Sequence, residues 1–344
     1  MSSIPAISVA ARSTFCTLLF GALVSLAACA PGDEASGPAP DKLKVIALPI
    51  LSWAPFYIAE EEGYFEEQNL EVEFIRLARN SDALPAMAQG DVDIGAGLLT
   101  AGLMNLIAEG ARLRLVADKS HLAADGCSHN AILVRRPLAE AGVLNDPAQI
   151  RGLRIEINRF LPEAFYADRV LRELGLTLDD LEIITLPPSS EADALDSGSV
   201  DLTIATEPDI TRLLMTGEAV LWKAAEEVIP GTQWSAVLYG RALLDERPEV
   251  GERFLVAYLL GVRQFNEGKT PRNLDILTRR TGLDEELLKA ACWAPIRDDG
   301  RVDAESLLEY QEWAVSRGIA KRVLSEDELA DHRFAEHANA VLVR

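Results

Sequence analysis

Short apolar runs alternate with amphipathic stretches along most of this chain. Strands are expected over residues 44–48, 71–75, 92–96 and 113–117, and helices over residues 56–68, 82–88 and 99–109. The second and third of these helices are followed by Gly90 and Gly110, and glycine readily takes the left-handed conformation that ends a helix. Regular alternation of strand and helix predicts a mostly parallel sheet with helices on both faces.

The same pattern occurs a second time. Strands are expected over residues 132–134, 154–157, 181–185 and 202–205, and helices over residues 147–150, 163–174 and 190–196. Residues 87–94 and 195–202 match each other, because in both a helix end meets a glycine, a short turn, an aspartate and a strand. The repeat predicts an α/β fold of two lobes, each a mostly parallel sheet flanked by helices.

After residue 236 the pattern changes to helices without intervening strands. These helices are expected over residues 248–266, 283–291, 304–317 and 326–339. Amphipathic helices of this kind are best placed against a lobe that is already built. With strand-like crossovers at 131–134 and 235–238, the predicted organisation is residues 43–130 plus 237–344 in lobe 1 and residues 131–236 in lobe 2.

The N-terminus has the pattern of an export signal. Arg12 is the only charged residue among the first 28, and it precedes an apolar run over residues 14–28 that ends in small residues. This arrangement is typical of a secretory signal peptide, and roughly 15 apolar residues are fewer than the ~20 that a membrane-spanning helix needs. We therefore expect a signal peptide over residues 1–28.

The end of this run, Leu-Ala-Ala-Cys at residues 26–29, is similar to a bacterial lipobox, in which Cys29 would be acylated and become N-terminal. A simple signal peptide with an incidental cysteine is the alternative. Residues 30–40 are rich in Pro, Gly and Ser and contain nothing apolar enough to pack. Residues 29–42 are thus expected to form a flexible tether that holds an exported protein on a membrane by palmitate-type lipid, facing the periplasm or the cell exterior.

Composition restricts the partners. Of the 344 residues, 54 are acidic and 33 are basic, which gives a net charge of −21. A surface this acidic repels phosphate backbones, so nucleic-acid binding is not expected. The acidity alone does not predict a cationic ligand, because acidic surfaces usually serve solubility.

The cysteines and histidines do not predict a metal or cofactor site. Cys16 would leave with the signal peptide, so Cys127 and Cys292 would be the remaining non-lipidated cysteines. An oxidising compartment permits a disulfide between them, but two buried thiols are the interpretation we favour. None of the four histidines has metal-ligand spacing beside another ligand type; two of them, His332 and His337, are expected on an exposed C-terminal helix.

Three short segments carry a family resemblance. The pattern P-x-Y-x-A-x-x-x-G-x-F is present in Pro55, Tyr57, Ala59, Gly63 and Phe65. A G-x-x-D turn follows in residues 89–95, and an E-P element lies in residues 205–208. In this order and spacing, over about residues 43–265, the chain resembles the type II periplasmic binding proteins for alkanesulfonates, taurine, nitrate and thiamine-type pyrimidines.

The resemblance implies two α/β lobes joined by two crossover strands, with the ligand in the cleft between them. It also implies a function as the extracytoplasmic solute-binding component of an ABC importer. Such a protein would work as a monomer, capture a small polar organic ligand such as a sulfonate or pyrimidine, and pass it to the permease. The chain departs from the family in residues 158–163, where relatives often have a Gly/Ser-rich turn, so no specific anion is carried over.

Ligands of open α/β sheets bind beyond the carboxyl ends of the strands. The side chains expected there, and therefore the candidate ligand-binding residues, are Ser52, Trp53, Phe56, Leu99, Thr100, Ser120, Asn158, Arg159, Glu207 and Trp234. Core packing is the alternative for the aromatic residues; we favour the cleft for Trp53.

Glu207 follows an apolar strand and is expected at the mouth of the sheet. Its alternative role is to cap the helix that begins near Asp209. We expect Trp53 and Glu207 to face each other across the cleft, and Arg159 to hold a carboxylate, sulfonate or phosphate. A ligand that meets both Glu207 and Arg159 would be zwitterionic or would carry an amino-heterocycle.

An enzyme on the same fold is the main alternative, of the pyrimidine-precursor or menaquinone-pathway type. Such an enzyme needs a nucleophile–base pair or a metal, and the sequence contains neither that constellation nor a Cys-rich iron motif. Export also argues against a cytoplasmic biosynthetic role. We therefore expect a binding protein and not an enzyme; a ligand-sensing lipoprotein is a further alternative.

Overall fold

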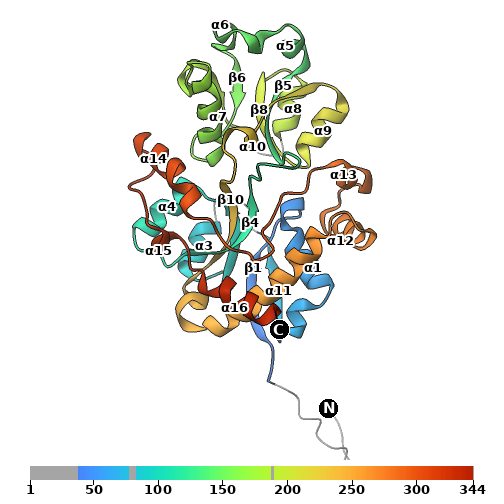
Figure 1. Ribbon diagram of the computed structural model, residues 1–344, viewed down its shortest axis with the longest axis vertical. Coiled ribbons are helices and arrows are strands. Elements are labelled where there is room, and N and C mark those ends of the chain that lie inside the picture. The colour runs from blue at the N-terminus through green and yellow to red at the C-terminus, as the bar shows by residue number, and fades with distance from the viewer. Residues whose placement is uncertain (1–37, 77–82, 187–189, 344) are drawn as a thin grey trace, which may run out of the picture. The chain divides into compact units, whose positions relative to one another are not determined.

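The computed structural model describes residues 38–76, 83–186 and 190–343. Residues 40–344 form one compact unit, shown in Figure 1. The predicted signal peptide, Cys29 and most of the predicted tether lie outside the described residues.

Two five-stranded sheets make up the framework, and the first has the order β2-β1-β3-β10-β4. Its strands are β1 (Asp41–Ile46), β2 (Leu70–Ile75), β3 (Ile94–Leu98), β4 (Arg114–His121) and β10 (Gln233–Tyr239). Strand β1 pairs in parallel with β2 and β3, whereas β10 lies antiparallel between β3 and β4. A late segment of the chain therefore completes the middle of the first sheet.

The second sheet has the order β7-β6-β8-β5-β9. Its strands are β5 (Asn130–Arg135), β6 (Arg154–Glu156), β7 (Glu182–Ile184), β8 (Leu202–Thr206) and β9 (Ala219–Ala224). Strand β6 is parallel to β7 and β8, and β5 lies antiparallel between β8 and β9. In each sheet, four strands thus run in one direction and the fifth runs antiparallel to them. This arrangement confirms the predicted fold class.

Helices flank both sheets. Those between the strands of the first sheet are α1 (Ala54–Glu61), α2 (Tyr64–Glu67), α3 (Ala83–Gln89) and α4 (Ala101–Ala108). Those of the second part are α5 (Arg136–Glu140), α6 (Pro147–Ile150), α7 (Pro162–Glu173), α8 (Glu191–Asp196), α9 (Asp209–Thr216) and α10 (Ala225–Val228). Short 3-10 turns include η1 (Leu51–Trp53), η3 (Val143–Asn145) and η4 (Leu178–Asp180).

The C-terminal third is helical, as predicted. Its elements are the π-helical turn η6 (Ala242–Glu246), α11 (Pro248–Asn266), α12 (Pro271–Thr281), α13 (Glu285–Ala290), the 3-10 turn η7 (Glu305–Leu307), α14 (Leu308–Ser316), α15 (Glu326–Leu329) and α16 (Arg333–Leu342). Helix α11 packs on α1 through its apolar stripe, with the ring of Tyr258 lying 4.8 Å from that of Phe56. The single helix predicted over 326–339 is broken after α15, where Asp331 N donates to Leu115 O at 2.9 Å.

Two crossovers, residues 122–129 and 225–232, join the sheets and bond to each other. Leu122 N donates to Thr232 O at 2.9 Å, and Gly231 N donates to Leu122 O at 2.6 Å. The Ser128 hydroxyl donates to Glu226 at 2.7 Å, and His129 Nδ1 lies 3.0 Å from the same carboxylate. The connection between the sheets is therefore one paired structure, not two independent strands.

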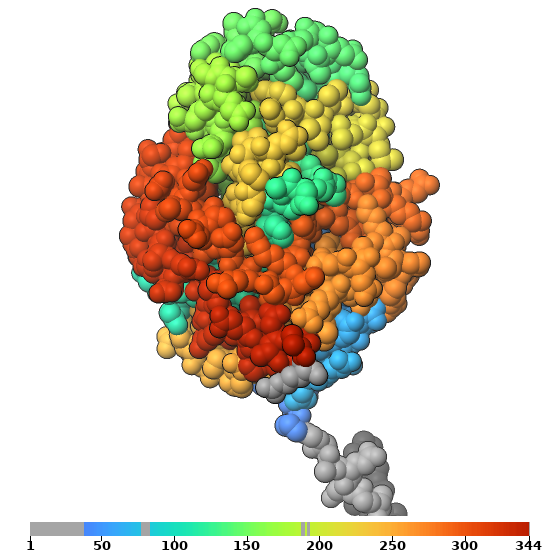
Figure 2. Space-filling model, viewed as in Figure 1, coloured from blue at the N-terminus to red at the C-terminus, as the bar shows by residue number. Residues whose placement is uncertain are grey.

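A third segment, between α13 and α14, crosses the face of the molecule seen in Figures 1 and 2. It runs beside β4, because Asp118 N donates to Gly300 O at 2.8 Å and His121 N donates to Pro295 O at 3.2 Å. The helices at its two ends contact helices of the second sheet, α13 on α9 and α14 on α7. The C-terminal region therefore bonds to both parts of the fold.

Candidate ligand-binding site

The carboxyl ends of the parallel strands lead into helices that begin at the same edge of each sheet. In the first sheet η1 and α1 follow β1, and α4 follows β3; in the second, α7 follows β6 and α9 follows β8. This edge is where open α/β sheets bind ligands, and the predicted site residues lie on or beside these elements and crossovers.

The aromatic residues after β1 are part of the core. Trp53 is 2% exposed and Phe56 is fully buried. Their ring centroids are 4.8 Å apart, and Phe56 also contacts the ring of Tyr258. Core packing, the alternative considered for both residues, is what the structure shows. Packing against Phe56 and Lys119 leaves almost none of the Trp53 surface free in this structure, and its predicted contact with a ligand stays a prediction.

Two of the remaining predicted residues near the first sheet, Thr100 and Ser120, have local partners. Thr100 is the N-cap of α4, and its hydroxyl accepts from Leu103 N at 3.1 Å. The hydroxyls of Ser120 and Ser235 are 2.7 Å apart, which ties β4 to β10. Ser52 is partly exposed in η1.

Leu99 and Trp234 are both buried, and they line the same small cavity, of about 10 Å³. Pro162 and Phe165 of α7 and Tyr310 of α14 also line it. This cavity therefore lies where the first sheet, the second part and the C-terminal helices meet, and a volume of this size holds about one water molecule.

Glu207 has the capping role that we considered as its alternative. Its carboxylate accepts from Thr211 N at 3.1 Å and from the Thr211 hydroxyl at 2.8 Å, in the first turn of α9. The same carboxylate accepts from Cys292 N at 3.1 Å. The side chain therefore bonds to α9 and to the C-terminal segment, and among the described residues its hydrogen bonds do not include one to Trp53.

Asn158 and Arg159 follow β6 and also have local partners. Asn158 Oδ1 accepts from Phe160 N at 3.0 Å, which shapes the loop. The guanidinium of Arg159 is exposed and lies 3.8 Å from the Asp179 carboxylate. Glu207 and Arg159 thus both have contacts within the protein, and a zwitterionic ligand held by the two of them stays a prediction.

The structure adds a residue that the sequence reasoning missed, Lys119. It is 3% exposed, and its Nζ lies 5.2 Å from the centre of the Trp53 ring. Burial lowers the pKa of Lys119 to about 7, while the nearby charge of Asp118 acts in the opposite direction. The signal in the sequence was the Asp-Lys pair directly after the strand predicted over residues 113–117, where Ser120 was chosen as a candidate and Lys119 was not.

The neighbouring Asp118 is fully buried and is already bonded on several sides. Its carboxylate accepts from Gln233 Nε2 at 2.6 Å and from Arg297 N at 2.8 Å, and the Arg297 guanidinium lies 3.3 Å away. His121 Nδ1 lies 2.8 Å from the same group. The negative charge of Asp118 is thus balanced by the C-terminal segment.

Glu163 is the second titratable residue of interest, in the first turn of α7. Burial raises its pKa to about 7, and the charge of Glu156 adds to this. Its Oε2 is buried without a hydrogen-bond partner among the described residues. The charge of Glu163, after burial itself, raises the pKa of Tyr310, so the two side chains are near each other between α7 and α14.

Cys127 and Cys292 form a disulfide, with their Cα atoms 5.6 Å apart. The expectation of two buried thiols is therefore wrong. The reason lies in the C-terminal segment: α13 packs on α9, and this brings Cys292 to the first crossover although 165 residues separate the two cysteines.

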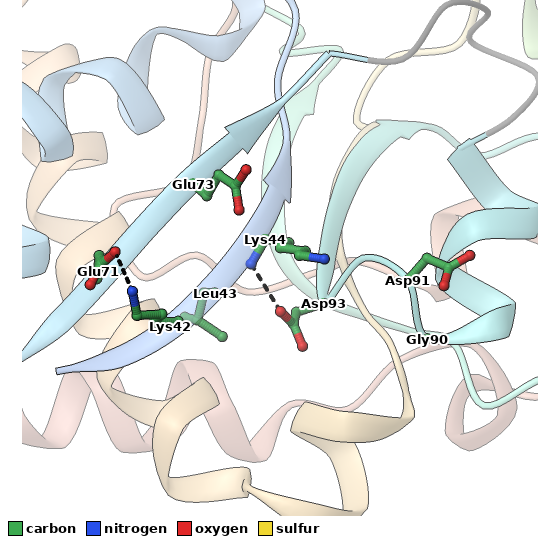
Figure 3. A pocket seen from close by; sticks show the side chains of 8 residues that line it. All are labelled: Lys42, Leu43, Lys44, Glu71, Glu73, Gly90, Asp91 and Asp93. Carbon is green, nitrogen blue, oxygen red and sulfur yellow. Dashed lines mark hydrogen bonds and ion pairs between the residues drawn. The ribbon is translucent and has the colours of Figure 1, made fainter. Parts of the chain in front are cut away.

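A larger hollow of about 410 Å³ lies elsewhere, at the amino ends of β1 and β2. Figure 3 shows Lys42 and Lys44 between the glutamates of β2 on one side and two aspartates on the other. Lys42 pairs with Glu71 at 2.9 Å, and Lys44 N donates to Asp93 at 2.9 Å. Since Lys42 pairs with Glu71 and the hollow lies at the opposite edge from the strand–helix loops, we do not place the ligand here.

Residues 51–267 match the model of the family described as NMT1/THI5 like. The chain belongs to the NMT1/THI5-like family. The match includes both sheets' strand–helix loops and the paired crossovers, and it confirms the resemblance found in the sequence. No curated protein matches the chain.

Several solved structures share the fold of this NMT1/THI5-like chain. The ligand-binding component of an ABC-type import system from Staphylococcus aureus, with zinc bound, has a TM-score of 0.71 at 15% identity, over 87% of this chain and 99% of that one. The periplasmic aliphatic sulphonate binding protein SsuA from Escherichia coli has a TM-score of 0.68 at 16% identity, over 85% and 92%. The periplasmic nitrate-binding protein NrtA from Synechocystis PCC 6803 has a TM-score of 0.70 at 14% identity, over 89% and 90%.

The fold also occurs in an enzyme. The desulfurization enzyme DSZB has a TM-score of 0.64 at 16% identity, over 88% of this chain and 99% of that one. Among the described residues, no three His, Cys, Asp or Glu side chains are grouped so as to hold a metal ion. In the same part of the chain, no helix is both long and apolar enough to cross a membrane.

Proposed function

We propose that this chain is the extracytoplasmic solute-binding component of an ABC importer and captures a small polar organic ligand between two lobes. The observation that carries the proposal is the pair of similar sheets joined by paired crossovers, in a family whose fold is shared with ABC import binding proteins. Closure of two lobes on a ligand by hinge bending suits this arrangement. The functional partner would be a permease, and the protein would act as a monomer.

For the lobes, we propose a hinge at the crossovers 122–129 and 225–232. Strand β10 starts at Gln233 and belongs to the first sheet, so we place the second boundary between residues 232 and 233, a few residues before the sequence-based one. The first boundary remains near residue 130. Helix α14 would move with the second sheet, because it packs on α7.

A ligand screen tests the proposal. Sulfonates, pyrimidines, amino acids and nitrate are added to the purified full chain, and the unfolding temperature is measured. A ligand at about 100 times its Kd is expected to stabilise the protein by about 2.7 kcal/mol, which is a shift of several degrees in Tm. Small-angle scattering should show a more compact protein with the ligand, and deletion of the gene should reduce uptake of that ligand by the cell.

The same experiment separates the alternatives. Conversion of the ligand to a product would favour an enzyme on this fold over a binding protein. Unchanged uptake after deletion of the gene, despite binding, would favour a ligand sensor and reject import. We propose the non-enzymatic function because the import-system proteins among the solved structures are binding components.

We also propose that Cys29 is lipidated and holds the chain on a membrane. Support comes from the lipobox-like residues 26–29 and the Pro/Gly/Ser-rich stretch after them. The wild-type protein is expected to partition into detergent, and Cys29→Ala is expected to release it in soluble form. Cys16→Ala serves as the matched control and should leave partitioning unchanged. A Cys29→Ala protein that stays with washed membranes would refute the anchor.

A further inference from the structure

Lys119 is a buried cation whose ammonium has no acidic partner of its own. No hydrogen bond or ion pair of its Nζ occurs within residues 38–76, 83–186 and 190–343; its recorded contact is the face of the Trp53 ring, at 5.2 Å. The adjacent carboxylate of Asp118 is bonded to Gln233, Arg297 and His121. Because an isolated buried charge is costly, a lysine in this position indicates a site that a ligand completes.

The N-terminus of α1 provides a second positive feature at the same place. Trp53 is the N-cap residue of α1, so the ring that contacts Lys119 lies at the start of this helix. The helix has no side-chain cap hydrogen bond and no acidic residue in its first turn. Ala54 N–H already donates to Leu51 O and Pro55 has no N–H, so the feature that favours a negative charge there is the helix dipole.

Position in the fold links these features to the ligand edge. Lys119 lies near the carboxyl end of β4, and Trp53 lies in η1 after β1. Both are therefore at the edge of the first sheet where ligands of open α/β folds bind.

We propose that Lys119 binds the oxyanion group of the ligand, a carboxylate or a sulfonate. The inference rests on the proposed function and narrows its ligand to a small organic anion. It also assigns the ion pair with the ligand to the buried Lys119 instead of Arg159. Arg159 pairs with Asp179, whereas Lys119 forms no ion pair with a carboxylate among the described residues. An ammonium held against a ring face is compact and suits an oxyanion of either kind.

The test compares anions with neutral compounds of nearly equal shape. Ethanesulfonate and ethanesulfonamide, and benzoate and benzamide, are titrated at up to millimolar concentration into the full chain and into its K119M and K42M variants. Lys42 is the matched control because it is exposed and pairs with Glu71 at the amino end of β1. At least one anion is expected to bind the wild type and K42M alike, to bind K119M at least tenfold more weakly, and to bind more tightly than its neutral partner.

A second measurement checks folding. Unliganded K119M should unfold at the wild-type temperature or above it, because the substitution removes a buried charge. Equal anion affinity of the wild type and K119M, or binding of neither anion by the wild type, overturns the inference. Tight binding of a neutral or cationic compound that K119M leaves unchanged also overturns the inference about Lys119, while the proposed function as a solute-binding protein still stands. Whether that proposed function fails is measured separately, by the uptake assay.

Discussion

Replacing Cys127 and Cys292 together with serine is expected to lower the free energy of unfolding by about 3–5 kcal/mol. The two cysteines are joined by a disulfide across 165 residues. In the chain-entropy model, a cross-link over a loop of this length is worth about 5 kcal/mol, because it restricts the unfolded chain. Denaturant unfolding of the oxidised full chain and of the double variant, under identical non-reducing conditions, measures the difference.

The reducing agent supplies the control. Dithiothreitol should bring the wild type down to the stability of the double variant and should leave the variant itself unchanged. Cys16 and Cys29 are present in every sample, so their chemistry cancels from the comparison. A difference of less than about 1 kcal/mol between the two oxidised proteins would contradict the prediction.

The disulfide should also affect α9. Cys292 donates its backbone N–H to Glu207, and Glu207 caps α9 through Thr211. The cross-link therefore fixes the C-terminal segment on the first crossover and keeps that donor beside the cap. Faster amide exchange in α9 and in residues 291–297 of the double variant is the expected local result.

The alternation of strand and helix was predictable because strands that are covered on both faces are short apolar runs and their helices are amphipathic. The two sheets, the repeated unit and the C-terminal helices follow from this pattern. Helix α12 was not predicted, although Thr270 and Pro271 form a recognisable start: the Thr270 hydroxyl accepts from Asn273 N at 3.2 Å. Its many charged residues hid a narrow apolar face that includes Leu274 and Leu277.

The place of β10 could not be read from local pattern. Its apolar run predicts a strand but contains nothing that selects a partner strand. The strands that it pairs with, β3 and β4, lie more than 100 residues earlier in the chain. The same limit applies to the disulfide, since a sequence does not contain the distance between two Cα atoms.

The candidate site was the least predictable part. Trp53 and Glu207 were chosen because they follow strands, but what a side chain does there depends on its neighbours. Phe56 and Lys119 pack against Trp53, and the start of α9 engages Glu207. Lys119 was not chosen, although its neighbour Ser120 was, because a sequence does not show that a lysine side chain is buried against the Trp53 ring.

Asp168→Ala is expected to lower the free energy of unfolding by about 3 kcal/mol, the lower end of the range for breaking a buried ion pair. The Asp168 side chain is 1% exposed. It accepts from Arg317 and from Arg172, each at 2.7 Å, and from Trp313 Nε1 at 2.9 Å. Arg317 and Trp313 belong to the region of α14, so this carboxylate joins α7 of the second sheet to the C-terminal helices.

The size of the effect follows from what the substitution leaves behind. Alanine removes the acceptor from the Trp313 N–H and the counter-charge from Arg317, which is partly exposed and regains some water. Asp168→Asn keeps an oxygen acceptor but loses the charge, so it should cost less than Asp168→Ala. Asp179→Asn is the matched control, because Asp179 is exposed and lies 3.6 Å from the same Arg317; its cost should be below about 1 kcal/mol.

The pH dependence distinguishes the charge from mere packing. Burial acts to raise the pKa of Asp168, but the hydrogen bonds from Arg172 and Trp313 and the charge of Arg317 outweigh it and lower the pKa below its ordinary value of 3.8. A carboxylate with a depressed pKa stabilises the fold fully above its unfolded pKa, and this contribution is lost as pH falls through the folded pKa. The gap in unfolding free energy between the wild type and Asp168→Asn should therefore be constant above about pH 5 and shrink below pH 4. A gap that does not change with pH would show that Asp168 acts through its shape and hydrogen bonds and not through its charge.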